Sequence, residues 1–259
     1  MKNTHCNRFR LLNLLLQFAL VVLCTQFRCA AGQFRCSDRV DSKVPTDYCP
    51  FVFAEIDGEP RGLFIDKEGD RDIILVVDRE KQRVASLTYE DDEDGEITVD
   101  KREVLQTDEV GINHGIVVNG GWLYLSSSSE VWKWKYEEGN VSGERVLVVQ
   151  GIPDDGHTTR TLVFYQGDLL VQVGSFDNVD RDPSRAMIRV VENGDGEELE
   201  WDDLPVFAEG LRNTVGLKVD TKGRLWGVEN GRDELNVPGV GDVHQNNPCE
   251  ELNLIQRER

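Results

Sequence analysis

A two-strand pattern recurs four times in this chain of 259 residues, and it restricts the possible folds more than any other feature. Each copy has an apolar strand, a turn that closes on glycine, and a second apolar strand that ends in small or polar residues. Aligning the copies on Gly62, Gly115, Thr161 and Gly216 gives separations of 53, 46 and 55 residues. Such spacing is typical of β-propeller blades, each a four-stranded sheet. The sequence therefore predicts an all-β propeller of about four blades, with a β-sandwich of similar hairpins as the alternative.

The first 32 residues have the features of a secretory signal peptide. Basic residues (Lys2, Arg8 and Arg10) precede the apolar run LLNLLLQFALVVLC, which is short for a membrane span and contains polar residues. A membrane anchor is the alternative. We expect residues 1–32 to be removed, residues 33–259 to form the partial propeller, and the protein to be secreted into the extracellular space without a membrane partner.

Three cysteines remain after the expected cleavage: Cys36, Cys49 and Cys249. Cys36 and Cys49 could close a short loop, which would leave Cys249 without a partner in this chain. Four blades arranged in an arc would also expose two large apolar faces. Both features favour a fragment of a longer, closed propeller.

The formal net charge of -19 argues against nucleic acid and anionic membranes as partners. An anionic ligand would have to be held by local positive groups against this overall field. The acidic run from Glu90 to Glu96 lacks the ligand spacing of an EF-hand loop and is interpreted as a solvated turn.

Polar pairs stand at matching positions, directly before the first strand of three repeats. They are His157 and Arg160, Arg212 and Asn213, and Asn113 and His114. In a propeller these positions converge on one end of the central channel, which is the usual kind of place for a binding site. Each pair also has an ordinary structural interpretation: His157 as a loop histidine, Arg212 paired with Glu209, and Asn113 and His114 as strand caps.

The segments that contain these pairs resemble one known family. They are GINHGIVVNGGWLYLSSSSEVWKW, GIPDDGHTTRTLVF, VGSFDNVD, FAEGLRNTVGLKVDTKGRLWGVENG and EELNLI. Together they are similar to the soluble glucose/sorbosone dehydrogenases that depend on pyrroloquinoline quinone (PQQ), and most similar to the secreted eukaryotic branch. The resemblance covers about Phe51 to Ile255. It implies a six-bladed propeller, of which this chain would hold the first four blades.

The resemblance also implies roles for individual residues. His157 matches the general base that takes a proton from a sugar hydroxyl while hydride passes to the quinone, and an imidazole titrates in the right range for this task. Arg212 and Asn213 match a pair that contacts the quinone, whose carboxylates suit a guanidinium. We assign Arg160 to the same cofactor site. Asn113 and His114 are assigned to the sugar substrate, and an external acceptor would take the electrons.

Calcium is the second cofactor that the resemblance implies. Relatives hold it with main-chain carbonyls of an E-x-G-P segment, which here reads ENGR, so Gly231 and Arg232 would supply the carbonyls. Arg232 departs from the usual proline, and its side chain would have to point away from the metal. Ser175 stands where bacterial relatives have an acidic residue that orients the histidine; either Asp177 replaces that residue or the histidine lacks support.

Two other functions stay open at this point. A calcium-dependent sugar lactonase shares the six-bladed fold, and Glu55, Asn113 and Asn213 could serve as its metal ligands. A non-catalytic propeller that binds carbohydrate or protein is the other. A lactonase would hydrolyse sugar lactones whether or not PQQ is added, and a binding module would turn over no substrate.

Overall fold

The computed structural model describes residues 52–67, 71–91, 97–107, 109–243 and 250–256. The expected signal peptide, Cys36, Cys49, Cys249 and most of the acidic run lie outside these residues. The chain divides into a large unit, residues 56–88 and 101–259, and a small unit, residues 1–55 and 89–100. In the small unit the rings of Phe53 and Tyr89 meet edge to face, with centroids 5.5 Å apart. No helix among the described residues is both long and apolar enough to cross a membrane.

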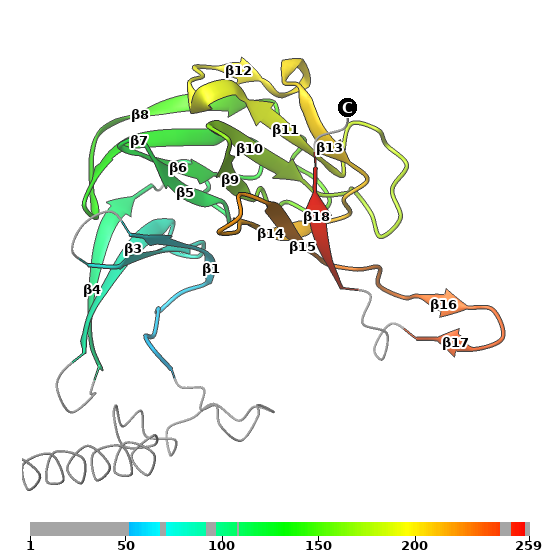
Figure 1. Ribbon diagram of the computed structural model, residues 1–259, viewed down its shortest axis with the longest axis horizontal. Coiled ribbons are helices and arrows are strands. Elements are labelled where there is room, and N and C mark those ends of the chain that lie inside the picture. Colours follow the sequence, from blue (N-terminus) through cyan, green and yellow to red (C-terminus); the bar gives the residue numbers. More distant parts are fainter. Residues whose placement is uncertain (1–51, 68–70, 92–96, 108, 244–249, 257–259) are drawn as a thin grey trace, which may run out of the picture. The chain divides into compact units, whose positions relative to one another are not determined.

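Four sheets follow one another along the described chain (Figure 1), and we number them as blades 1 to 4. Blade 1 holds β1 (Pro60–Asp66), β2 (Ile73–Asp78), β3 (Arg83–Asp91) and β4 (Ile97–Gln106). Blade 2 holds β5 (Ile116–Asn119), β6 (Trp122–Ser126), β7 (Val131–Glu137) and β8 (Asn140–Gln150). Blade 3 holds β9 (Leu162–Tyr165), β10 (Asp168–Val173), β11 (Met187–Val191) and β13 (Val206–Glu209). Blade 4 holds β14 (Thr214–Val219), β15 (Leu225–Glu229) and β18 (Glu251–Ile255).

The remaining elements are short and lie in connections. Between β11 and β13 the chain forms two 3₁₀ turns, η2 (Glu192–Gly194) and η3 (Trp201–Asp203), and β12 (Leu199–Glu200), which pairs in parallel with β8 of blade 2. Between β15 and β18 it forms a small hairpin of β16 (Asn236–Val237) and β17 (Gly241–Asp242). The prediction of an all-β propeller with about four blades is confirmed.

Apolar side chains on both faces of blades 2 and 3, and on one face each of blades 1 and 4, fill three cores, each between two successive blades. Neighbouring residues of one strand therefore belong to different cores. On β10, Leu169 packs into the core shared with blade 2, whereas Leu170 packs into the core shared with blade 4. On β6, Tyr124 likewise packs into the core shared with blade 3, and Leu125 packs into the core shared with blade 1. This burial of both faces explains why the strands are nearly continuous apolar runs.

The recurring glycine marks the point where the first strand of one blade passes the next blade. A Cβ at Gly62 would lie 1.8 Å from the His114 carbonyl oxygen, and one at Gly115 would lie 2.1 Å from the Arg160 carbonyl oxygen. Neither distance is sterically possible, so only glycine fits. In the third repeat Thr161 replaces the glycine, and its hydroxyl donates to the Thr214 carbonyl at 2.8 Å. In the first three repeats the position aligned from sequence is thus the inter-blade contact, whereas a Cβ at Gly216 would meet only Val228 of its own blade, at 3.9 Å.

Burial of both blade faces can be tested with two adjacent leucines. Leu169→Ala and Leu170→Ala should each lower the free energy of unfolding by about 2–5 kcal/mol, because Leu169 is 0% and Leu170 1% exposed. Val206→Ala, at a position 43% exposed, is the control and should change it by about 0.5 kcal/mol or less. Urea unfolding measures the free energy of unfolding of all three variants. A large loss for only one leucine would indicate a sheet with one buried face.

Candidate functional site

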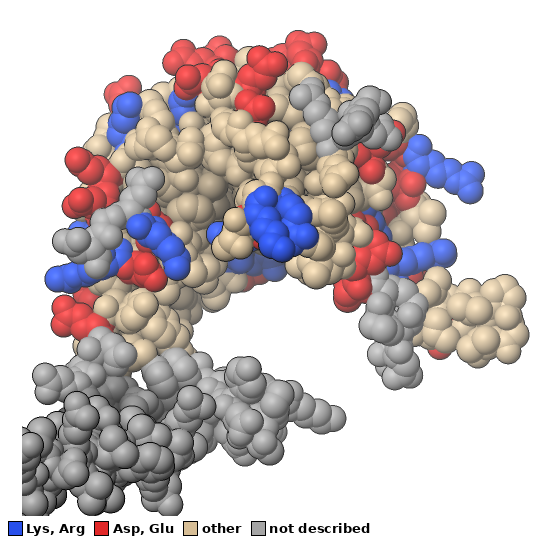
Figure 2. All heavy atoms as spheres, viewed as in Figure 1, with Lys and Arg blue, Asp and Glu red and all other residues tan. Residues whose placement is uncertain are grey.

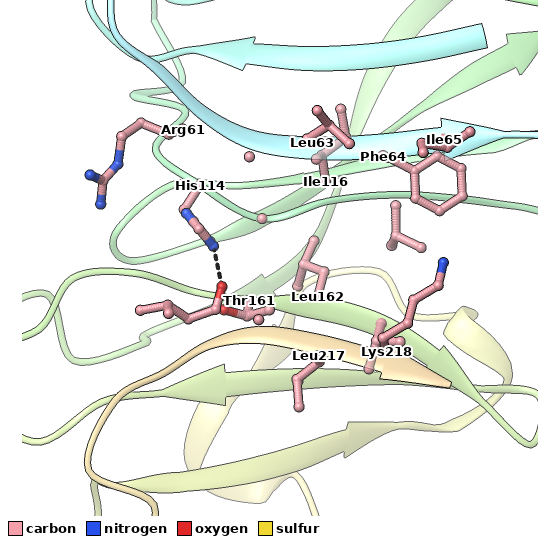
Figure 3. A pocket seen from close by; sticks show the side chains of 16 residues that line it. Arg61, Leu63, Phe64, Ile65, His114, Ile116, Thr161, Leu162, Leu217 and Lys218 are labelled. Carbon is pink, nitrogen blue, oxygen red and sulfur yellow. Dashed lines mark hydrogen bonds between the residues drawn. The ribbon is translucent and has the colours of Figure 1, made fainter. Parts of the chain in front are cut away.

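The first strands of the four blades line one pocket with a volume of about 400 Å³ (Figure 3). The four residues on which the repeats were aligned, Gly62, Gly115, Thr161 and Gly216, all contribute to its lining. The hydrophobic part comes from side chains such as Leu63, Ile116, Leu162 and Leu217. Repeats that are about 50 residues apart in sequence therefore place equivalent positions around one cavity, as the propeller prediction required.

The pocket is lined by basic rather than acidic charged side chains, although the protein as a whole is acidic. Acidic side chains are spread over the face of the large unit that Figure 2 shows. The lining residues include Arg61, His114 and Lys218 but no carboxylate. Figure 3 shows Arg61 and Lys218 at opposite ends of the pocket. The residue composition at the channel thus suits anionic or neutral ligands better than cations.

His114 crosses this pocket from blade 2 to blade 4. Its Nε2 lies 2.9 Å from the Val215 carbonyl oxygen, which can only accept, so Nε2 carries the proton. Its Nδ1 is buried and has no hydrogen-bond partner among the described residues. Burial lowers the pKa of His114 below its usual value, and the charge of Arg61 lowers it further. His114 is therefore a neutral link between two blades, with Nδ1 as its unused acceptor.

His157 lies in the irregular segment between β8 and β9 and is held by Ser175, two residues after the end of β10. Its Nδ1 lies 2.8 Å from the Ser175 carbonyl oxygen and 3.2 Å from the Ser175 hydroxyl. Because a carbonyl oxygen can only accept, the neutral ring carries its proton on Nδ1. Nε2 is then the basic nitrogen, and it has no hydrogen bond among the described residues. This is the protonation pattern that a general base requires.

Ser175, rather than an acidic side chain, supports the histidine. Its hydroxyl donates to the Asp177 main-chain carbonyl at 2.8 Å, whereas the Asp177 carboxylate accepts from the Asn178 amide. Neither sequence-based alternative was right: His157 is supported, and not by the Asp177 carboxylate. The sequence does show that the second strand of each repeat ends in small or polar residues, and Ser175 is one of them.

The two asparagines of the predicted site fasten the loop that carries His157. Asn113 donates from Nδ2 to the Thr158 carbonyl at 2.9 Å, and the Thr159 hydroxyl donates to Asn213 Oδ1 at 2.8 Å. Asn213 Nδ2 makes no hydrogen bond within the described part of the chain and stays available as a donor. The adjacent residues Asn113 and His114 therefore have separate tasks, the first on the loop and the second in the pocket.

Arg160 does not agree with its assignment to cofactor binding. The residue is 0% exposed, and four of its five N–H groups donate to main-chain carbonyls. These carbonyls belong to Ser128, Pro153, His157 and Thr159. A guanidinium with these contacts cannot also grip a ligand carboxylate through two N–H groups.

Arg212 lies beside the His157 loop and is partly open to solvent. Its carbonyl accepts from the Ser175 amide at 2.7 Å, so the Ser175 peptide stands between the two predicted site residues. Its guanidinium pairs with the Asp233 carboxylate at 2.9 Å and also donates to Asn178 and to the Asn230 carbonyl. The pairing with Glu209, considered from sequence, is replaced by this one. The Asp233 side chain is 75% exposed, so an anionic ligand can compete for Arg212 from the solvent side.

The segment predicted to hold calcium follows β15 next to Asn213. The Asn230 amide donates to the Asn213 carbonyl at 3.0 Å, and the Gly231 amide donates to the Glu250 carboxylate at 2.8 Å. Arg232 is exposed. The described residues contain no group of three His, Cys, Asp or Glu side chains that could hold a metal ion. A cation on this segment would depend on main-chain carbonyls.

Glu229 is a buried carboxylate of this region that sequence reasoning missed. It ends β15, is 8% exposed, and accepts from the Arg212 amide at 2.9 Å. Burial raises its pKa, although the hydrogen bond from Arg212 opposes the change. By accepting this hydrogen bond, Glu229 fixes the main chain at Arg212, from which the arginine side chain extends.

Sequence comparison with known proteins identifies a family and relatives that match most of this chain. A family model described as TrAA12-like matches residues 43–259. A pyrroloquinoline quinone-dependent sugar dehydrogenase of Hypocrea jecorina (strain QM6a) is 32% identical over 218 residues, which are 75% of this chain and 48% of that protein. A pyrroloquinoline quinone-dependent pyranose dehydrogenase of Coprinopsis cinerea is 31% identical over 214 residues, 74% of this chain and 28% of that protein. The chain thus spans less than half the length of these relatives.

Solved structures with a similar fold belong to the same kinds of protein as these relatives. The calcium structure of a Trichoderma reesei carbohydrate-active enzyme of family AA12 has a TM-score of 0.65 at 30% identity and covers 77% of this chain and 52% of its own. The holo form of the pyranose dehydrogenase PQQ domain from Coprinopsis cinerea has a TM-score of 0.64 at 29% identity, with 77% and 51% covered. The predicted resemblance to PQQ-dependent sugar dehydrogenases is confirmed. With the repeats, the His157 loop and the family model in agreement, this chain belongs to the TrAA12-like family.

Proposed function

We propose that this chain carries the catalytic base of a secreted quinoprotein dehydrogenase that oxidises a sugar hydroxyl. The observation that carries the proposal is the hydrogen bonding of His157: its Nδ1 is fixed on Ser175, whose amide binds the Arg212 carbonyl, and its Nε2 is a free acceptor. Relatives that are PQQ-dependent sugar and pyranose dehydrogenases support the reaction class. Because the chain spans less than half of those proteins, the activity is proposed for the complete protein.

The reaction removes two electrons and two protons from the substrate. A sugar C–OH becomes a carbonyl when the hydroxyl proton leaves to His157 Nε2 and the carbon loses hydride. PQQ, when bound, supplies the electrophile that accepts the hydride. The resulting imidazolium keeps its Nδ1 proton on the Ser175 carbonyl, so the ring does not have to reorient during proton transfer. An external acceptor then removes the electrons.

The described residues fit an anionic quinone of this kind. Arg212 supplies a cation whose present partner, Asp233, is a largely exposed carboxylate, and Asn213 supplies a free amide donor. A guanidinium binds a carboxylate of a ligand in the same way as it binds the carboxylate of Asp233. The Gly231 and Arg232 carbonyls would hold calcium, since hard cations prefer oxygen ligands. Residues 1–32 would direct the protein out of the cell.

The role of His157 is tested by His157→Ala in the protein loaded with PQQ and Ca²⁺. Sugar-dependent reduction of a dye should fall about 100-fold or more, the usual contribution of a general base. PQQ affinity, measured by absorbance titration, should stay within about twofold, because the proposed cofactor contacts lie on Arg212 and Asn213. Turnover that survives the substitution within a few-fold would contradict the assignment. Lactone hydrolysis that does not depend on PQQ would support the lactonase alternative instead.

The role of Arg212 is tested by Arg212→Ala. Loss of a charged hydrogen bond should weaken PQQ binding by about 10-fold or more. The matched control is Arg224→Ala, which removes an arginine from the same blade that is also paired with a carboxylate, Asp220, at 2.7 Å. That control should leave the dissociation constant of PQQ unchanged. Equal affinities for the Arg212 variant and the parent would rule out the cofactor contact.

A further inference from the structure

Arg160 is a buried cation without a carboxylate partner among the described residues. No ion pair within 4.0 Å of its guanidinium is present in that part of the chain, although the residue is 0% exposed. Taking an unpaired charge out of water is costly, and a protein keeps one only where the surrounding dipoles compensate for it. The compensation here comes from carbonyl oxygens in direct contact with the guanidinium, and the charges of Asp154 and Asp155, which lie farther away, also favour its protonated form.

Those carbonyls belong to the irregular segment that carries His157. No regular strand or helix covers residues 151–161, so their main-chain groups lack the partners that a sheet would provide. The Arg160 guanidinium donates to the carbonyls of Pro153, His157 (2.6 Å) and Thr159 (2.8 Å). It therefore closes this segment upon itself, around one buried positive charge.

The same guanidinium attaches the segment to blade 2. Its Nε donates to the Ser128 carbonyl, in the β6–β7 connection, at 2.9 Å. The Arg160 carbonyl in turn accepts from the Ser126 hydroxyl at 2.8 Å. Arg160 is thus held at both its main chain and its side chain by blade 2, while its other contacts reach the residue that carries the reacting imidazole.

We propose that Arg160 is the positioning residue for His157: it fixes the His157 main chain from one side while Ser175 fixes the imidazole from the other. The proposal rests on the proposed function of His157 and gives Arg160 no contact with substrate or cofactor. The Ser175 carbonyl accepts both the His157 amide, at 3.0 Å, and its Nδ1. The ring therefore keeps one tautomer only if the His157 main chain keeps its place beside Ser175.

Arginine suits this task better than lysine. Burial, together with the nearby charge of Arg185, lowers the pKa of Arg160 to about 10 against the opposing charges of Asp154 and Asp155, so the side chain stays protonated at neutral pH. A lysine starts from a lower pKa and loses its proton more readily when buried. It also has three N–H donors on one nitrogen, so it cannot reach four carbonyls that surround a planar fork.

The experiment compares Arg160→Lys and Arg160→Met with the parent protein. ¹⁵N NMR of the histidine side chains reads the tautomer of His157, and hydrogen exchange reads the protection of the amides in residues 153–160. Both readouts work without turnover, so they remain valid if the proposed dehydrogenase function fails. We expect the variants to lose the single Nδ1-protonated form and to exchange the loop amides at least 10-fold faster.

Kinetics of the loaded protein add a second readout. A base displaced by about 1 Å should lower kcat by up to about 100-fold, whereas the KM for sugar and the PQQ affinity should stay within about twofold. Arg185→Met is the matched control: Arg185 pairs with Asp155 of the same segment and with Asp182, and its guanidinium lies over the Phe176 ring, but no hydrogen bond or ion pair joins it to His157. It should retain the His157 tautomer and kcat.

Three outcomes would overturn the proposal. The first is an unchanged His157 tautomer and loop protection in Arg160→Lys. The second is an equal change in the Arg185 control, which would indicate general loosening of the segment. The third is a loss of PQQ affinity as large as that in kcat, which would return Arg160 to the cofactor site. If Arg160→Met does not fold, Arg160→Lys together with Ser126→Ala, which removes the hydroxyl that holds the Arg160 carbonyl, carries the same comparison.

Discussion

The packing of each blade against the next, at the start of its first strand, is the constraint on which the rest of the structure depends. At Gly62 and Gly115 the neighbouring main chain comes so close that no side chain fits, and at Thr161 a hydroxyl bridges the same gap. This contact sets the spacing of the blades around the pocket. It also determines where the segments directly before the first strands lie, and those segments carry His157 and Arg212. The position of the candidate base therefore follows from the packing of the sheets.

Those segments have no sheet partners of their own, and polar side chains take over that task. Asn113, Asn213 and Arg160 satisfy main-chain or hydroxyl groups of the loop that carries His157. Ser175 links this loop to Arg212 through its peptide group. Hydrogen bonds of this kind restrict an irregular segment, since a polar group that has a partner loses that bond when the segment rearranges. Precise placement of a base in a loop requires such a network.

The two arginines that were predicted to bind the cofactor have different environments. Arg160 is enclosed by carbonyls and has no route to a ligand, whereas Arg212 shares its charge with the exposed Asp233. The first arrangement favours rigidity, and the second favours exchange of one carboxylate for another. In a protein of net charge -19, a cation that already holds a carboxylate at the surface is the place that we propose for an anionic cofactor.

The sequence by itself determined the fold class, the register of the four repeats and the polar pairs, several of which are linked through the loop that carries His157. It could do so because alternating apolar strands, glycine turns and fixed spacing are local properties that the chain repeats. The partners of each polar side chain were decided only by the tertiary structure. Nothing in the segment around Arg160 distinguishes an arginine that faces a ligand from one that faces Pro153 and Ser128. Likewise, Ser175 supports His157 through a main-chain carbonyl, a group that every residue has, so only the approach of the two chain segments identifies it.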